Sequence, residues 1–80
     1  MSDYALYYIE TCRESIRQLS TEYARLVLRQ KREPNPTRKA QLERELSMIR
    51  SEITANQDDI RIAKENDRRR EMPIETAYSK

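Results

Sequence analysis

Residues 34–36 read Pro34–Asn35–Pro36, and they lie near the middle of an 80-residue chain that contains no glycine. A proline lacks the amide hydrogen that a helix interior needs, and it disfavours helical geometry in the residue before it. Asparagine is a favourable helix N-cap, and proline is well tolerated at the first helical position. The tripeptide therefore predicts the end of one helix and the start of another, with Asn35 as the N-cap.

Apolar residues on both sides of this turn recur at alternating spacings of four and three, the pattern of a left-handed helix pair. The two seams that follow this pattern are Ala5, Ile9, Cys12, Ile16, Leu19, Tyr23 and Leu26, and Leu42, Leu46, Ile49, Ile53, Asn56, Ile60 and Ala63. When the chain folds back on itself, opposed members have residue numbers that sum to 68 or 69. The fold-back point then lies at Pro34–Asn35, in agreement with the turn.

The sequence thus predicts an all-α fold, an antiparallel two-helix hairpin. We expect residues 1–72 to form the hairpin, with helices at about 3–32 and 37–71 and a turn at 33–36, and residues 73–80 to form a flexible tail. The second apolar stripe is expected to end after Ala63. Because a two-helix seam buries few side chains against the entropy cost of ordering the chain, we expect a homodimer that forms a four-helix bundle.

The composition excludes several classes of protein. Hydrophobic residues make up 36% of the chain and charged residues 38%, and no apolar run is long enough to span a membrane. Met1–Ser2–Asp3 is not followed by the basic and apolar regions of a secretory signal. A single cysteine, Cys12, cannot form an internal disulfide, which is typical of a reducing compartment. These features predict a cytoplasmic protein that does not contact a membrane.

Groups suited to catalysis are scarce. The chain has no histidine, so zinc ligands are few, and without glycine it has no phosphate-binding loop. The acidic doublet Asp58–Asp59 lies on a predicted helix, where neighbouring side chains point about 100° apart. We therefore expect no catalytic residues, no metal, no cofactor and no enzymatic activity.

Tyrosine supplies all five aromatic residues, and three of them fall in the first turns of the first helix. Tyrosine is enriched at protein interfaces because it combines a large contact area with a polar hydroxyl. The seam cannot cover all the apolar groups at this end of the hairpin. We predict a partner-binding surface there, formed by Tyr4, Leu6, Tyr7, Tyr8 and Ile62. The alternative is that these residues close the end of a dimeric bundle.

Positive charge gathers near the turn, although the net charge is only +2. The basic residues in this region are Arg25, Arg29, Lys31, Arg32, Arg38 and Lys39. They are candidate contacts for nucleic-acid phosphates, which bind Lys and Arg in a salt-dependent way. The acidic middle of the hairpin argues against a duplex lying along its length.

Two seam residues have alternative roles. Asn56 is a polar residue opposite Cys12, and a single buried asparagine can fix helix register and oligomeric state. Its alternative role is a local loosening of the seam that admits water. Cys12 is expected to act as a small buried hydrophobe, with a redox role as the alternative.

The leading functional prediction is a non-enzymatic interaction protein, an adaptor or steric inhibitor that binds a larger partner protein. The first alternative is a dimeric nucleic-acid-binding hairpin that uses the basic turn region, and the second is a structural assembly subunit. The layout of two seams and a short turn is similar to the dimeric RNA-binding hairpins of plasmid copy control. Hairpins of this size also occur as secretion co-chaperones and as phage-encoded inhibitors of host systems.

Overall fold

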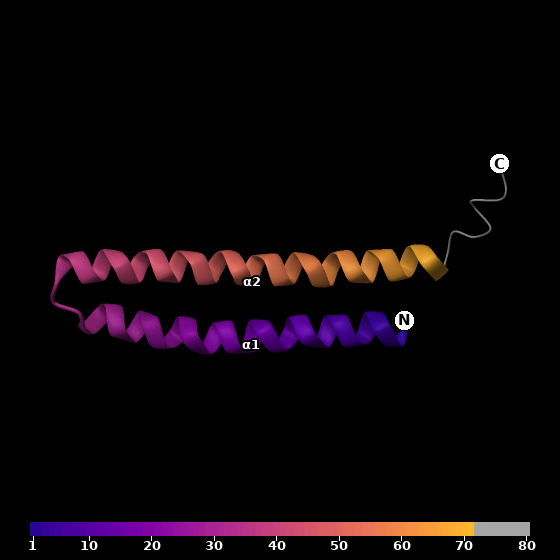
Figure 1. The fold of residues 1–80 in the computed structure, drawn as a ribbon, viewed down its shortest axis with the longest axis horizontal. Helices are drawn as coiled ribbons and strands as arrows, with labels where there is room; N and C mark the ends of the chain where they lie inside the picture. The colour runs from indigo at the N-terminus through magenta and orange to yellow at the C-terminus, as the bar shows by residue number, and fades with distance from the viewer. Residues whose placement is uncertain (72–80) are drawn as a thin grey trace.

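The computed structural model describes residues 1–71, with side chains up to residue 68. It contains two α-helices, α1 (Asp3–Arg32) and α2 (Pro36–Glu71), and the described residues include no strand. Figure 1 shows the helices antiparallel and side by side, joined at one end by residues 33–35. This arrangement confirms the predicted all-helical hairpin. The flexible tail expected at 73–80 lies outside the described residues.

Capping residues set the helix ends, and Asn35 is the N-cap predicted for the second helix. Oγ of Ser2 accepts a hydrogen bond of 3.1 Å from the Ala5 amide at the start of α1. At the start of α2, Oδ1 of Asn35 accepts a 2.9 Å hydrogen bond from the Thr37 amide. Glu33, the C-cap of α1, is extended with φ −79° and ψ 117°, as the following proline favours. Pro36 is the first residue of α2, where its missing amide hydrogen has no consequence.

The apolar seams lie between the helices. All fourteen residues of the two predicted seams are buried or half-buried, so the four-and-three spacing located the contact face correctly. The core cluster lies in the half of the hairpin nearer the turn. Its buried members are Leu26, Leu46 and Ile49, and around them pack Leu19, Tyr23, Val27, Leu42 and Ile53. In the other half the buried side chains are Ala5, Ile9 and Cys12.

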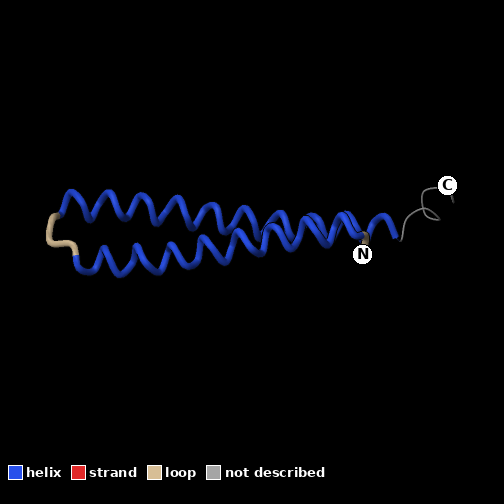
Figure 2. Tube along the Cα trace, turned by 60° about the horizontal axis from the view of Figure 1, so that its bottom comes forward, coloured by secondary structure: helices blue, strands red, loops and turns tan. Residues whose placement is uncertain are grey.

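The two ends of the hairpin differ in what they expose. We call residues 25–39 the tip, and residues 1–9 with 59–68 the open end. In the turned view of Figure 2 the traces are apart at the tip and cross near the N-terminus, so the helix axes are inclined to each other. The open end therefore combines the first turns of α1 with a late part of α2, two segments far apart in the sequence.

Candidate protein-binding surface at the open end

Exposed apolar side chains are concentrated at the open end. Among the described residues, six of the eight exposed large hydrophobic side chains lie there, namely Met1, Tyr4, Leu6, Tyr7, Tyr8 and Ile62. The other two, Leu28 and Met48, lie apart from each other near the tip and in the middle of α2. Tyr4 and Tyr7 are the most exposed of the eight, at 75% and 74%. The exposed large hydrophobic side chains of the described hairpin are therefore concentrated at the open end.

Tyr4, Tyr8 and Ile62 line a hollow of about 240 Å³ between the two helices. Tyr4 and Tyr8 are one helical turn apart, so they lie on the same face of α1. From α2 the lining residues fall at spacings of three and four, which places them on one face as well. The remaining lining residues are Ala5, Asp59, Ala63, Asn66 and Asp67. We call this feature the open-end hollow.

The predicted surface residues do not all share this hollow. Tyr7 directly precedes Tyr8 in the sequence, so its side chain is turned about 100° from that of Tyr8 around the helix. It lines a different, shallow hollow on the outer side of α1, next to Glu10 and Thr11. Leu6 lines neither hollow. The structure thus brings Tyr4, Tyr8 and Ile62 together and leaves Tyr7 and Leu6 on adjoining faces.

The hydroxyl of Tyr8 lies near a carboxylate, that of Asp59. The nearby Asp59 carboxylate, and secondarily burial, raise the pKa of the Tyr8 hydroxyl above its usual value of 10.0. No lysine or arginine lines the open-end hollow. Within the described side chains, Asp59 takes part in no ion pair. The hollow is therefore apolar and aromatic on its walls and negative at Asp59.

Asp67 forms the far wall of the hollow, and it is a buried carboxylate, 8% exposed. Its Oδ1 accepts a hydrogen bond of 3.1 Å from the Ser2 amide, and its Oδ2 lies 3.8 Å from the Met1 amino nitrogen. The second apolar stripe ends at Ala63, as expected, and Asp67 occupies the next seam position with a polar contact instead of an apolar one. The residue numbers indicate this pairing, because 2 and 67 sum to 69, as the numbers of opposed seam residues do.

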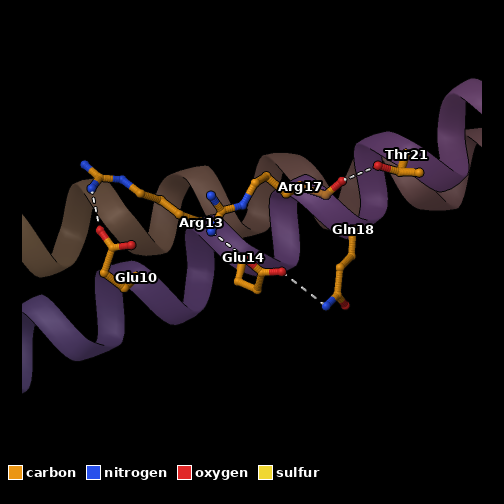
Figure 3. Close-up of polar contacts among 6 residues, drawn as sticks. All are labelled: Glu10, Arg13, Glu14, Arg17, Gln18 and Thr21. Atoms are coloured by element: carbon orange, nitrogen blue, oxygen red, sulfur yellow. Dashed lines mark hydrogen bonds and ion pairs between the residues drawn. The ribbon is translucent and has the colours of Figure 1, made fainter.

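The middle of α1 carries charges that satisfy one another. Figure 3 shows Glu10 with Arg13, and Glu14 with Arg17 and Gln18, all within the same helix. Arg13 Nη1 donates to Glu10 Oε1 at 2.8 Å, and the Thr21 hydroxyl donates to the Arg17 carbonyl at 3.0 Å. These local pairs are exposed and leave little unbalanced charge for a partner on this segment.

The tip presents the basic residues predicted as nucleic-acid contacts, and all six are exposed. Arg29 and Arg38 line a shallow hollow that also contains Glu33 and Glu45. None of the six basic residues belongs to an ion pair among the described side chains. The tip is a second charged surface, opposite in sign to the open-end hollow.

A polar cluster that the sequence did not reveal lies on one side of the core. Arg50 Nη1 donates a 3.1 Å hydrogen bond to the Tyr23 hydroxyl, and its guanidinium carbon lies 5.9 Å from the ring centroid. Arg50 Nη2 also donates to Glu43 Oε1 at 3.1 Å, and Gln30 Nε2 donates to Glu43 Oε2 at 3.0 Å. The hydrogen bonds from Gln30 and then Arg50 lower the pKa of the Glu43 carboxyl.

Asn56 is half-buried in the seam, as predicted. Its side-chain amide donates to the Glu52 carbonyl at 2.9 Å, one turn back in the same helix, so this hydrogen bond does not cross to α1. The role of Asn56 in setting register stays a prediction. Cys12 is buried with a free thiol, in the place expected for a small hydrophobe.

The described side chains include no group of three or more His, Cys, Asp or Glu placed to hold a metal ion. Neither α1 nor the described part of α2 has the length and apolar character needed to cross a bilayer. Comparisons of the chain with protein families, with curated proteins and with solved structures find no match.

Proposed function

We propose that the chain is a non-enzymatic protein-binding hairpin, an adaptor or steric inhibitor that holds a larger partner protein at its open end. The observation that carries the proposal is the gathering of six of the eight exposed large hydrophobic side chains at this end. The seams are already buried within the hairpin, so these side chains are surplus to the core. Exposed apolar patches of this kind mark interaction sites in soluble proteins.

The open-end hollow supports the proposal because it offers a place for an anchoring side chain. Interface energy is concentrated in a few residues, often aromatic, that sit in desolvated pockets. Tyr4 and Tyr8 supply aromatic walls for such a pocket, and Ile62 supplies apolar surface from the other helix. Tyr7 and Leu6 extend the apolar surface onto the adjoining faces.

Capture of a partner from lysate by immobilised full chain tests this proposal. We expect a protein that is retained after nuclease treatment and is lost when Tyr4 and Tyr8 are both replaced by alanine. The matched control is Leu28→Ala, which removes an exposed large apolar side chain far from the open end. A partner retained by the double tyrosine variant, or lost with the Leu28 variant, contradicts the proposal. Circular dichroism checks that each variant is helical.

The predicted homodimer belongs to the same proposal. A four-helix bundle would bury the outer faces of the hairpin along their length, yet beyond the open end these faces expose only Leu28 and Met48 among large hydrophobic residues of the described chain. A second copy would therefore gain most by covering the open end. In that case dimerisation and partner binding compete for one surface, and added partner should shift the chain from dimer to complex.

Nucleic-acid binding at the tip is the second candidate function. The observation that favours it is the set of six exposed basic residues without ion-pair partners among the described side chains. Binding at this site would weaken steeply with salt. Reversing the charges of Arg29, Arg32 and Lys39 should abolish it, whereas the tyrosine variants should leave it intact. RNA or DNA recovered in the capture experiment without nuclease would favour this candidate.

A further inference from the structure

We propose that the partner places an arginine side chain in the open-end hollow, beside the Tyr8 ring and the Asp59 carboxylate. The inference rests on the proposed function and names the chemistry of the partner's docking segment. That segment carries an arginine flanked by apolar residues, which contact Tyr4 and Ile62.

The hairpin already contains one complete example of this recognition. Arg50 lies over the ring of Tyr23, donates to the Tyr23 hydroxyl and donates a second hydrogen bond to Glu43. A guanidinium is suited to this role because it is planar, weakly hydrated and able to serve a ring and a carboxylate together. The three groups are a tyrosine on α1, a carboxylate on α2 and an arginine.

The open-end hollow has a tyrosine on α1 and a carboxylate on α2, but no arginine. Tyr8 lies on α1 and Asp59 on α2, and the two are close enough that the carboxylate raises the pKa of the Tyr8 hydroxyl. No basic side chain lines the hollow, and none among the described residues pairs with Asp59. An arginine from a partner would give the hollow the same three groups that Tyr23, Glu43 and Arg50 form near the core.

The surroundings of Asp59 strengthen this interaction relative to an ordinary surface ion pair. Asp59 is half-buried, whereas its neighbour Asp58 is exposed and lies 3.9 Å from Arg61 in an ion pair on the outer face of α2. Docking of apolar partner residues on Tyr4 and Ile62 would remove water from the hollow. Electrostatic interactions are stronger where water is excluded, and charge-assisted hydrogen bonds are stronger than neutral ones.

The same side of the hairpin stays acidic beyond the hollow. The next depression along the two helices is lined by Glu22 and Glu52 with no basic residue. Glu52 and Asp59 are seven residues apart in α2, about 10 Å along the axis at 1.5 Å per residue. A helical partner segment with basic residues seven positions apart would therefore meet both carboxylates, and phosphate groups would be repelled by them.

A selection from random peptides of about twelve residues, long enough for about three helical turns, tests the inference. The library is panned on immobilised full chain, and peptides that also bind the Tyr4→Ala/Tyr8→Ala variant are discarded. We expect the remaining peptides to be enriched in arginine. Replacing that arginine by citrulline, its neutral isostere, should weaken binding at least about tenfold, as loss of a charge-assisted hydrogen bond predicts.

Asp59→Asn should weaken binding of the arginine-containing peptides to a similar degree. The matched control Asp58→Asn should change their affinity less than about twofold. Tyrosine-dependent peptides that lack arginine, or that bind Asp59→Asn as well as wild type, overturn this inference and leave the proposed function standing. A selection that yields no tyrosine-dependent peptide counts against both. If the chain binds itself, and this binding is lost both in Asp59→Asn and on neutralising Arg29 and Arg38, the occupant is a second copy and the inference is overturned.

Discussion

The Ser2 amide donates a hydrogen bond of 3.1 Å to the buried carboxylate of Asp67, 65 residues along the chain. Ser2 also caps α1 through its side chain, so one residue starts the first helix and joins it to the second. Asp67 occupies the seam position that follows Ala63. The hairpin seam therefore ends at the open end in a polar contact, directly beside the open-end hollow.

Replacing Asp67 by alanine should destabilise the hairpin by about 1–3 kcal/mol, because the Ser2 amide loses its partner in a partly buried site. Urea unfolding followed by circular dichroism measures the change. Asp58→Ala is the control, since Asp58 is exposed and pairs only locally with Arg61 at 3.9 Å. Equal stability of the two variants would show that the Ser2–Asp67 contact contributes nothing to folding.

Glu43 should make stability depend on pH. Its pKa in the folded chain is lowered from the usual 4.5 by hydrogen bonds from Gln30 and Arg50. A carboxyl with a lowered folded pKa contributes stability above its unfolded pKa, and this contribution is lost as the pH falls through the folded value. Glu43→Gln should therefore show a smaller drop in Tm between pH 7 and acid than wild type. The group is exposed, so we expect a modest effect that fades in high salt.

A matched variant isolates this effect. Glu45→Gln makes the same change two residues away and leaves the hydrogen bonds of Gln30 and Arg50 to Glu43 in place, so it should keep the wild-type acid dependence. If Glu43→Gln and wild type lose Tm in parallel on acidification, the Glu43 contacts do not stabilise the folded state.

Asn56→Leu should raise the thermal stability of the hairpin and permit other oligomeric states. The asparagine amide donates its hydrogen bond within α2, to the Glu52 carbonyl, so its removal breaks no hydrogen bond between the described parts of the two helices. A leucine would add apolar surface at this half-buried seam position, for a gain of about 1 kcal/mol. Calorimetry and sedimentation velocity measure the two effects. A variant less stable than wild type would point to polar partners that Asn56 has in the folded assembly.

The predicted homodimer can be tested by sedimentation equilibrium at micromolar concentration, where we expect a dimer or larger species. If the second copy covers the open end, the Tyr4→Ala/Tyr8→Ala variant should dissociate at lower concentration than wild type, because apolar burial is lost from the interface. A well-folded monomer with a cooperative thermal transition would contradict the prediction.

The fold was predictable because local and long-range signals agreed. Pro34–Asn35–Pro36 marks the turn through backbone chemistry alone, and the seam numbering places the fold-back at the same residues. The apolar spacing does not reveal Asp67 as a seam residue, because Asp67 carries a carboxylate. A buried carboxylate is recognised only when its donor is known, and here the donor is a backbone amide at the other end of the chain.

The candidate surface was predictable only in part. Composition and position placed Tyr4, Tyr7 and Tyr8 at one end. Which of them share a hollow depends on the side of α1 that faces α2. In the structure Tyr4 and Tyr8 line one hollow with Ile62, and Tyr7 lines another. From the sequence, Asp59 stands out only as part of an acidic doublet with Asp58. Its place beside Tyr8 depends on the pairing of the two helices across the seam, which the spacing within either helix does not reveal.

The most direct test of the central claim, that a partner protein docks at the open end, is chemical-shift mapping by NMR. The isotope-labelled full chain is titrated with the captured partner, and backbone amide shifts are followed for residues 1–71. The account predicts that the largest shifts fall at residues 2–9 and 59–67. Shifts concentrated at residues 25–39, with the open end unchanged, would contradict it.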